Sequence, residues 1–283
     1  MTSTVTTATE QVLRRVPVGT PESLGARRRR RRLLELGLAA GIPAALVALW
    51  QVASDQEWIS SRIYPPPSRV VSAVGDLWSA GRLQDAILDS LQVILAGFVI
   101  GALAGFAVGV LTGASALAKA ALEPLLMGLY VVPKLAMLPV FLTVFGFGTA
   151  PKVALVVVTV FFFVWIDVME AMWRIPEGYL EAARSLRLSR WGTFQHVRLP
   201  GVLPNLLVSL RISIGVAVLV TIAAEFIVGG TGLGYLIFSS NQYFLLDRVY
   251  AGIVTVALLG VLLSWLIAFA GRRLTPWIRG RAR

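Results

Sequence analysis

The sequence predicts an all-α polytopic membrane protein with about six transmembrane helices. Only 14% of its 283 residues are charged, and its mean hydropathy is +0.76, so the chain has more apolar surface than a soluble domain of this length could bury. The apolar residues gather in runs of about 20, long enough to cross ~30 Å of hydrocarbon. These runs lack the alternating pattern of barrel strands, whereas a helix satisfies its own backbone hydrogen bonds in lipid.

Each predicted span is an apolar run that ends at charged or turn residues; the six runs cover 33–54, 88–112, 120–146, 151–171, 204–228 and 249–270. The third run is interrupted by Pro133, Lys134 and Pro139, which predicts a kinked helix. The second run carries a glycine at every fourth residue, namely Gly97, Gly101, Gly105 and Gly109. This stripe predicts close helix packing, either within the subunit or across a dimer.

The distribution of basic residues predicts the orientation. With both termini in the cytoplasm, nineteen Arg and Lys residues fall on the cytoplasmic side and five on the other, which is a positive-inside pattern. Residues 1–32 are expected to form a disordered basic cytoplasmic tail, followed by a transmembrane domain over 33–283. We do not expect a cleaved signal peptide, because the apolar segment 33–54 has full spanning length and no small-residue cleavage site follows it.

The arginine run from Arg27 to Arg32 has two possible functions. It could bind nucleic acid, but it lies directly before an apolar span, where anionic lipid attracts basic side chains. We therefore expect membrane lipid as its partner and no nucleic acid.

Patterns typical of catalytic and metal sites are absent from the sequence. The chain has no cysteine, and its single histidine, His196, has no second ligand at metal-binding spacing. Neither a Ser-His-Asp arrangement nor a defensible catalytic carboxylate pair is present. We therefore expect no catalytic residue and no metal site.

A polar segment between the fourth and fifth spans, residues 176–200, predicts a cytoplasmic protrusion. Residues 177–187 read as a short helix with Pro176 at its start, and Ser189 can cap a second short helix that Pro200 closes. Two short helices joined by a turn form a protrusion rather than a linker. The small side chains of Ala182 and Ala183 would let another surface approach closely.

This segment, "EAARSLRLSRWGTFQHVRLP", resembles the cytoplasmic EAA loop of permease subunits in binding-protein-dependent ABC importers. The family pattern is Glu-Ala-Ala, a Gly four positions after the second Ala, and a closing Ile-x-Leu-Pro; the matching residues here are Glu181, Ala182, Ala183, Leu199 and Pro200. Two positions depart from it, since Arg187 replaces the usual Gly and Val197 the usual Ile. The first departure affects the turn between the two short helices, and with it the docking geometry.

The resemblance extends over most of the chain from residue 33. The segments "LYVVPKLAMLPVFLTVFGFGTAPKV", "AAEFIVGGTGLGYLI" and "RRLTPW" are similar to those of permeases that import nitrate, taurine and aliphatic sulfonates. A type I ABC importer permease fold is thereby implied, with a translocation path for a small solute, an anion of this kind. The resemblance does not identify the solute.

The resemblance also implies the partners and the mechanism. Two permease copies would form the path, two ATPase subunits would close on ATP and Mg, and an external binding protein would deliver the solute at the inner membrane of a prokaryote. The coupling residues would be Glu181, Ala182, Ala183, Arg187, Leu199 and Pro200. This chain has no GxxxxGK[ST] motif that could cradle nucleotide phosphates, so it would hold no cofactor and would leave ATP hydrolysis to the partner.

Ionisable residues within spans are functional candidates. We expect Arg211 to form a structural ion pair with Asp167 or Glu170, with contact to an anionic solute as the alternative. Lys134 could face the path, or it could snorkel or pair with an acid. Glu225 lies near the outer end of the fifth span, where we expect it to fasten the outer loop, through backbone donors of a Gly-rich turn.

The Gly-rich segment "GGTGLG" over 229–234 follows a span rather than a buried strand, which argues against a dinucleotide site. Gly230, Gly232 and Gly234 could give a gate its backbone freedom, or they could be simple loop punctuation.

Three alternatives to this interpretation remain. A secondary transporter would need no ATPase but more often shows twin broken helices, and we find no internal repeat. A membrane-embedded enzyme would need clustered catalytic residues. An importer of a pyrimidine-like compound would differ from an anion importer in the pocket of its external binding protein.

Overall fold

A computed structural model describes residues 21–275 of the chain, which divides into two units, Met1–Ser61 and Arg62–Arg283. In the first unit the helix α1 runs from Pro21 to Asp55. Residues 21–32, predicted to belong to a disordered tail, therefore form the first turns of α1, which is consistent with the high helix propensity of arginine. The remainder of the predicted tail, residues 1–20, lies outside the described residues, as do residues 276–283.

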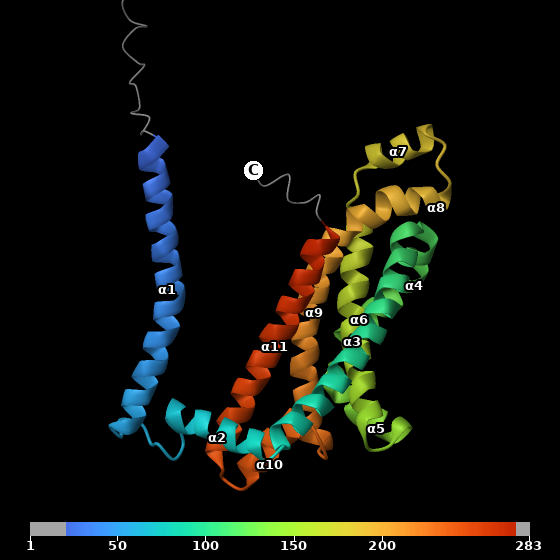
Figure 1. Cartoon of the computed structure of the whole chain (residues 1–283). Helices are drawn as coiled ribbons and strands as arrows, with labels where there is room; N and C mark the ends of the chain where they lie inside the picture. Colours follow the sequence, from blue (N-terminus) through green and yellow to red (C-terminus); the bar gives the residue numbers. More distant parts are fainter. Residues whose placement is uncertain (1–20, 276–283) are drawn as a thin grey trace, which may run out of the picture. The chain divides into compact units, whose positions relative to one another are not determined.

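The second unit is built from helices and short connections (Figure 1). Along the chain these are α2 (Pro67–Ser79), α3 (Arg82–Ala114), α4 (Ala116–Val131), the 3₁₀ helix η1 (Lys134–Met137), α5 (Leu138–Phe145), α6 (Thr149–Trp173), α7 (Glu177–Ser185), α8 (Arg190–Thr193), the π-helical turn η2 (Phe194–Arg198), α9 (Leu199–Val228), α10 (Leu233–Gln242) and α11 (Leu246–Leu274).

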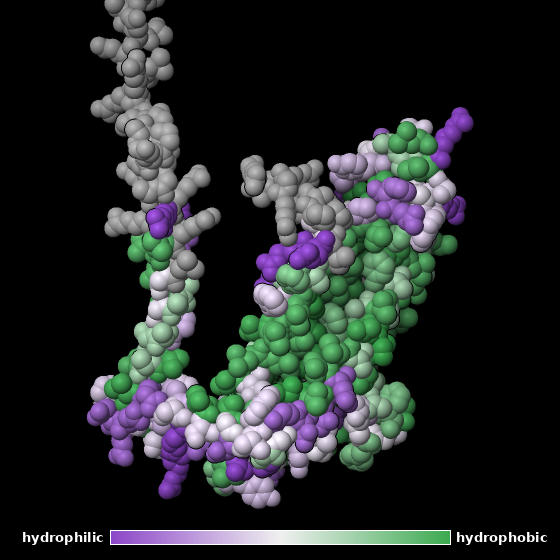
Figure 2. Space-filling model, in the orientation of Figure 1, coloured by the Kyte–Doolittle hydropathy of each residue, from purple (hydrophilic) through white to green (hydrophobic). Residues whose placement is uncertain are grey.

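Five helical segments of the described chain are long and apolar enough to cross a membrane, and a bent pair is a sixth candidate. The five are Leu33–Asp55, Arg82–Ala114, Thr149–Trp173, Arg190–Val228 and Leu246–Arg273. Figure 2 shows the matching surface of the second unit, where apolar side chains form a wide band and polar side chains gather at its two ends. The all-α membrane fold predicted from the sequence is confirmed.

The third predicted span is broken rather than gently kinked. Helix α4 and the segment from Lys134 to Phe145 meet at an angle of 89°. Val132, before Pro133, is extended (ψ 127°), because the proline ring disfavours a helical conformation in the preceding residue. Pro133 also has no N–H group to continue the helix.

The glycine stripe of α3 packs against α6 within the same subunit, which decides between the two predicted packings. Alanine Cβ atoms placed at Gly101 and Gly105 would lie 2.6 Å from the carbonyl oxygens of Val157 and Phe161 on α6. Gly97, Gly109 and Gly113 approach α6 in the same way. Helix α6 carries the fully buried Trp165 and also contacts α9, so it occupies the centre of the unit.

Two short helices outside the predicted spans, α2 and α10, complete the unit. Helix α2 begins with a proline in its first turn and buries Val70, Ala73 and Leu77 along one face. It is tied to α11 by an ion pair of 2.7 Å between Arg69 and Asp247. Helix α10 packs against α9 and α11, and both short helices lie at the same end of the unit (Figure 1).

Candidate functional site: an exposed hairpin and the ionisable residues of the spans

The predicted protrusion is a helical hairpin formed by α7 and α8, which lies at the opposite end of the unit from α2 and α10 (Figure 1). Helix α7 covers Glu177–Ser185, slightly less than the predicted 177–187. Ser189 caps α8 as predicted, because its Oγ accepts a hydrogen bond of 3.0 Å from the N–H of Gly192.

Arg187 ends α7 in a left-handed backbone conformation, with φ at 51°. The N–H of Arg187 bonds to the carbonyl oxygen of Arg184 at 2.9 Å, and the N–H of Leu188 bonds to that of Ala183 at 3.0 Å. This pair of bonds is a Schellman motif, whose left-handed position glycine favours. The backbone geometry therefore explains why glycine is usual where this chain has Arg187.

The hairpin exposes some of the predicted coupling residues and buries one. Glu181 and Ala182 are exposed, whereas Ala183 is only 2% exposed and is therefore covered by the chain itself. The expectation that Ala183 allows close approach of a partner is therefore not met in this chain. Large exposed side chains of Tyr179, Leu186, at 74% exposure, and Trp191 provide apolar surface instead.

Pro200 does not close the second short helix, contrary to the prediction. The helix continues from Arg190 to Val228, and Pro200 lies in the first turn of α9 just after Leu199. The π-helical turn before it uses bonds to the fifth preceding residue, such as Leu199 N–H to Phe194 O. This register shift lets the helix accommodate the missing N–H of the proline.

Glu225 is fully buried and joins three helices at the other end of the unit. Its carboxylate accepts hydrogen bonds from Ser90 Oγ of α3 at 2.8 and 3.0 Å and from the N–H of Gly234 of α10 at 2.7 Å. Ser90 Oγ in turn accepts from the N–H of Leu233 at 2.8 Å. Glu225 thus fastens the Gly-rich turn through a backbone donor, as the sequence predicts.

The Gly-rich turn depends on its glycines for two physical reasons. Gly229, Gly230 and Gly232 all have positive φ, where side chains cause strain. A Cβ at Gly232 would also collide with the Glu225 carboxylate. The buried Lys152 of α6 holds the same turn by donating to the carbonyl oxygens of Gly229, at 3.0 Å, and Thr231, at 3.3 Å.

Ser90 and Lys152 are partners that sequence reasoning did not find. Ser90 lies 135 residues before Glu225 in the chain, and Lys152 lies 77 residues before Gly229. Neither residue belongs to a recognisable motif, so only the packing of α3, α6 and α9 brings them to this turn.

Lys134 lies at the break between α4 and η1 and caps the end of α4. Its Nζ donates to the carbonyl oxygens of Tyr130, Val132, at 2.9 Å, and Leu129, at 3.4 Å. The ammonium also lies over the rings of Tyr130 and Phe162. This arrangement satisfies carbonyl groups that a helix end leaves without partners. A place for Lys134 in the solute path stays a prediction.

The expected ion pair of Arg211 does not form within residues 21–275. Glu170 is bonded instead by Arg174, one turn further along α6, at 2.7 Å, and Arg211 has no bonded partner among the described residues, Asp167 included. The physical reason is position, since Arg211 lines a groove between α9 and α11. Within the described residues no cluster of His, Cys, Asp or Glu could hold a metal ion.

Comparison with known proteins gives a family match over most of the second unit. Residues 97–276 match the family described as "Binding-protein-dependent transport system inner membrane component". The chain is 38% identical over 221 residues to the "Putative aliphatic sulfonates transport permease protein SsuC" of Escherichia coli K12, covering 78% of this chain and 84% of the relative.

Two further relatives have similar identity. The taurine transport system permease protein TauC of E. coli K12 is 31% identical, with 86% of this chain and 90% of the relative covered. The nitrate import permease protein NrtB of Leptolyngbya laminosa is 32% identical, with 82% and 85% covered.

Two solved structures have a fold similar to that of this chain. A chain of the inward-facing MetNI methionine ABC transporter aligns with a TM-score of 0.57 at 24% identity, covering 69% of this chain and 95% of that one. A chain of a bacterial ABC transporter involved in alginate import aligns with a TM-score of 0.62 at 15% identity, covering 89% and 99%.

Proposed function

Because this chain belongs to the family of binding-protein-dependent transport system inner membrane components, we propose that it forms the membrane path of an importer for a small anion, driven by a separate ATPase. Its relatives are permease subunits of ABC transporters rather than enzymes. The solute class we propose is an aliphatic sulfonate, taurine or nitrate. This class is supported by the relatives' names, which include permeases for each of these anions.

The observation that carries the proposal is the exposed α7–α8 hairpin. Glu181 and Ala182 lie on its surface, and Glu181 has no hydrogen-bond or ion-pair partner among the described residues. The same hairpin also exposes the apolar side chains of Leu186 and Trp191. An unpaired carboxylate on a hairpin with exposed apolar surface suits contact with another protein, and we assign that partner as the ATPase subunit.

The proposed assembly contains two permease copies, two ATPase subunits that bind ATP and Mg, and an external binding protein. The hairpin would lie in the cytoplasm, so the turn held by Glu225 would lie at the outer surface of a prokaryotic inner membrane, consistent with the positive-inside pattern. ATPase closure would move the hairpin, and the packed spans would follow as a rigid body. We further propose that Glu225, Gly230, Gly232 and Gly234 anchor the outer gate.

The first experiment tests the coupling role of the hairpin. Full-length chain carrying an affinity tag is purified from its own organism, and we expect an ATPase subunit to be retained. Glu181→Lys should reduce this retention at least fivefold and leave membrane insertion normal. Glu177→Lys is the matched control, because Glu177 is an exposed acid of the same helix. Full retention by the Glu181 variant, or equal loss in both variants, contradicts the proposed contact.

A second experiment tests the solute class. The gene is deleted in its own organism, and the uptake of taurine, pentanesulfonate and nitrate is measured with isotopically labelled compounds. We expect uptake of at least one of these anions to fall and to return with a plasmid copy. Unchanged uptake of all three together with reduced uptake of a pyrimidine would support the pyrimidine importer instead. Transport without any retained ATPase would support a secondary transporter.

A further inference from the structure

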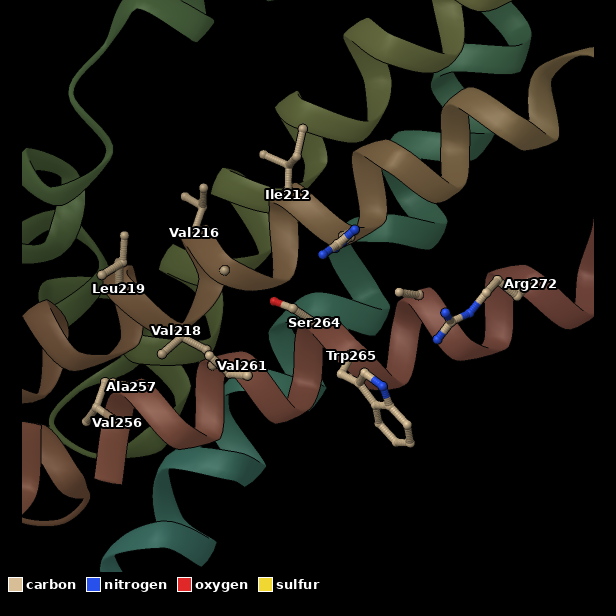
Figure 3. A pocket seen from close by; sticks show the side chains of 14 residues that line it. Ile212, Val216, Val218, Leu219, Val256, Ala257, Val261, Ser264, Trp265 and Arg272 are labelled. Atoms are coloured by element: carbon tan, nitrogen blue, oxygen red, sulfur yellow. The ribbon is translucent and has the colours of Figure 1, made fainter. Parts of the chain in front are cut away.

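A long groove runs between α9 and α11. Its volume is about 740 Å³, and its lining is mostly apolar. Figure 3 shows Ile212, Val216 and Leu219 along α9 and Val261 along α11, with the Ser264 hydroxyl turned toward α9. A second groove of about 650 Å³ continues from it to Pro204 and Thr275 and shares Arg211, Ile212, Ser264, Ala268 and Arg272 with the first.

The joined groove is long and narrow along the helices. On α9 its lining extends from Leu219 to Pro204, which is about 22 Å at 1.5 Å per residue. About 12 Å of this length lies beyond Arg211, which is enough for part of an extended acyl chain. A small solute would occupy only part of such a groove.

The charge of the groove lies at its middle and toward one end, since Arg211 is about midway along the α9 lining and Arg272 is near the end formed by Pro204 and Thr275. Arg211 and Arg272 line both parts of the groove, and no Asp or Glu is among the lining residues of either part. Arg211 is exposed and has no bonded partner among the described residues. A guanidinium on a transmembrane helix needs an anionic or polar partner, so the part of the groove around Arg211 is complementary to a negative group.

We propose that this groove binds an acidic phospholipid of the cytoplasmic leaflet. Its phosphate would lie between Arg211 and Arg272, and part of an acyl chain would follow the apolar lining from Arg211 toward Leu219. The leaflet rests on the orientation in our proposed function, because Arg272 is in the last turn of α11, at the end of the unit that carries the hairpin (Figure 1). The lipid geometry agrees with this orientation, since Arg272 lies at the end of the groove toward the membrane surface and the lining beyond Arg211 is apolar.

The test uses the full-length chain in detergent with phosphatidylglycerol and phosphatidylcholine at equal concentration, and the retained lipid is counted by native mass spectrometry. Each basic group near a membrane surface contributes a factor of about 5, so the two arginines predict a preference for phosphatidylglycerol on the order of 25-fold. Arg211→Gln and Arg272→Gln should each remove a factor of about 5, and Arg211→Lys should keep most of the preference.

Arg190→Gln is the matched control, because Arg190 is an exposed arginine of α8 that lines neither part of the groove. Gel filtration of every variant verifies that it is folded. No preference for phosphatidylglycerol in the unmodified chain, or an unchanged preference in the folded double variant, overturns the proposal.

A cysteine probe separates the other possible occupants. The chain contains no cysteine, so Val216→Cys is the single thiol in the groove. We expect phosphatidylglycerol to protect this thiol from alkylation. A disulfide between two copies at this position would place a second subunit on the groove, and protection by pentanesulfonate alone would place the solute there. Either result rejects the lipid site. Lipid retention is measured without the ATPase, so its outcome is independent of the coupling and uptake experiments.

Discussion

Arg187 illustrates how one backbone angle can oppose the preference of a side chain. The Schellman motif at the end of α7 requires a left-handed residue, and a Cβ in that conformation costs roughly 1–2 kcal/mol. The turn therefore forms against a local strain that glycine would remove. Within the hairpin, the Ser189 cap and the burial of Ala183 are stabilising contributions that offset the strain at Arg187.

Replacing Arg187 with glycine should stabilise the hairpin by about 1 kcal/mol. Hydrogen exchange measures this directly, because local opening exposes the N–H groups of residues 187 and 188. We expect their exchange to slow about fivefold in Arg187→Gly. The control is Ser185→Gly in the last turn of α7, where glycine should speed exchange. Faster exchange in Arg187→Gly would show that the arginine side chain stabilises the turn.

Glu225→Ala should be among the most destabilising substitutions in the chain. It leaves the buried N–H of Gly234 and the hydroxyl of Ser90 without their acceptor, and each such group costs about 1–3 kcal/mol. Glu225→Gln keeps one oxygen as an acceptor and should cost less than half as much. The check is the thermal unfolding midpoint in detergent, with Glu123→Ala as a control, since the Glu123–Lys119 pair is partly exposed at 3.9 Å. Equal midpoints for Glu225→Ala and the control would refute this role of Glu225.

Single residues could be predicted from the sequence only where a local pattern carried the information. Ser189 as a cap and Glu225 as an anchor follow from their places beside a short helix and a Gly-rich turn. The burial of Ala183 depends on the tertiary packing around α7, and the partner of Glu170 depends on a choice between Arg174 and Arg211. Sequence reasoning was wrong on both, because each is decided by three-dimensional proximity.

At the scale of elements, the close contact of α3 with α6 depends on the absence of side chains. Gly105→Ala would place a methyl group 2.6 Å from the Phe161 carbonyl oxygen, so the helices must separate. We expect a loss of about 1–3 kcal/mol in stability and a lower unfolding midpoint. Gly128→Ala on α4 is the control, because its Cβ would contact nothing within 4 Å. A neutral Gly105→Ala would mean that the two helices can move apart freely.

Hydropathy predicted the long helices well because a span needs about 20 apolar residues wherever it lies in the chain. It missed α2 and α10, which are too short to be spans. A helical repeat in α2, where Val70, Ala73 and Leu77 share one buried face, is the signal that could have found it. The continuation of α8 into α9 through a π-helical turn had no such signal, since Pro200 itself suggests a helix boundary.

For the whole molecule, the absence of cysteine makes the proposed orientation directly testable. Ser185→Cys lies on the exposed hairpin, and Thr231→Cys lies on the exposed part of the Gly-rich turn at the other end. In intact cells an impermeant maleimide should label only the Thr231 variant. In inside-out vesicles it should label only the Ser185 variant. The reversed pattern would contradict the positive-inside interpretation.

The unbroken helix from Arg190 to Val228 has a mechanical consequence. Its long part, α9, contains 30 residues and spans about 45 Å, with the hairpin at one end and Glu225 near the other. A tilt of α9 by about four degrees about the hairpin end displaces its far end by roughly 3 Å, which is the length of one hydrogen bond. A tilt of α9 relative to α3 and α10 by this amount would therefore break the bonds from Ser90 and Gly234 to Glu225, whereas a rigid-body motion of the three helices together leaves these bonds intact.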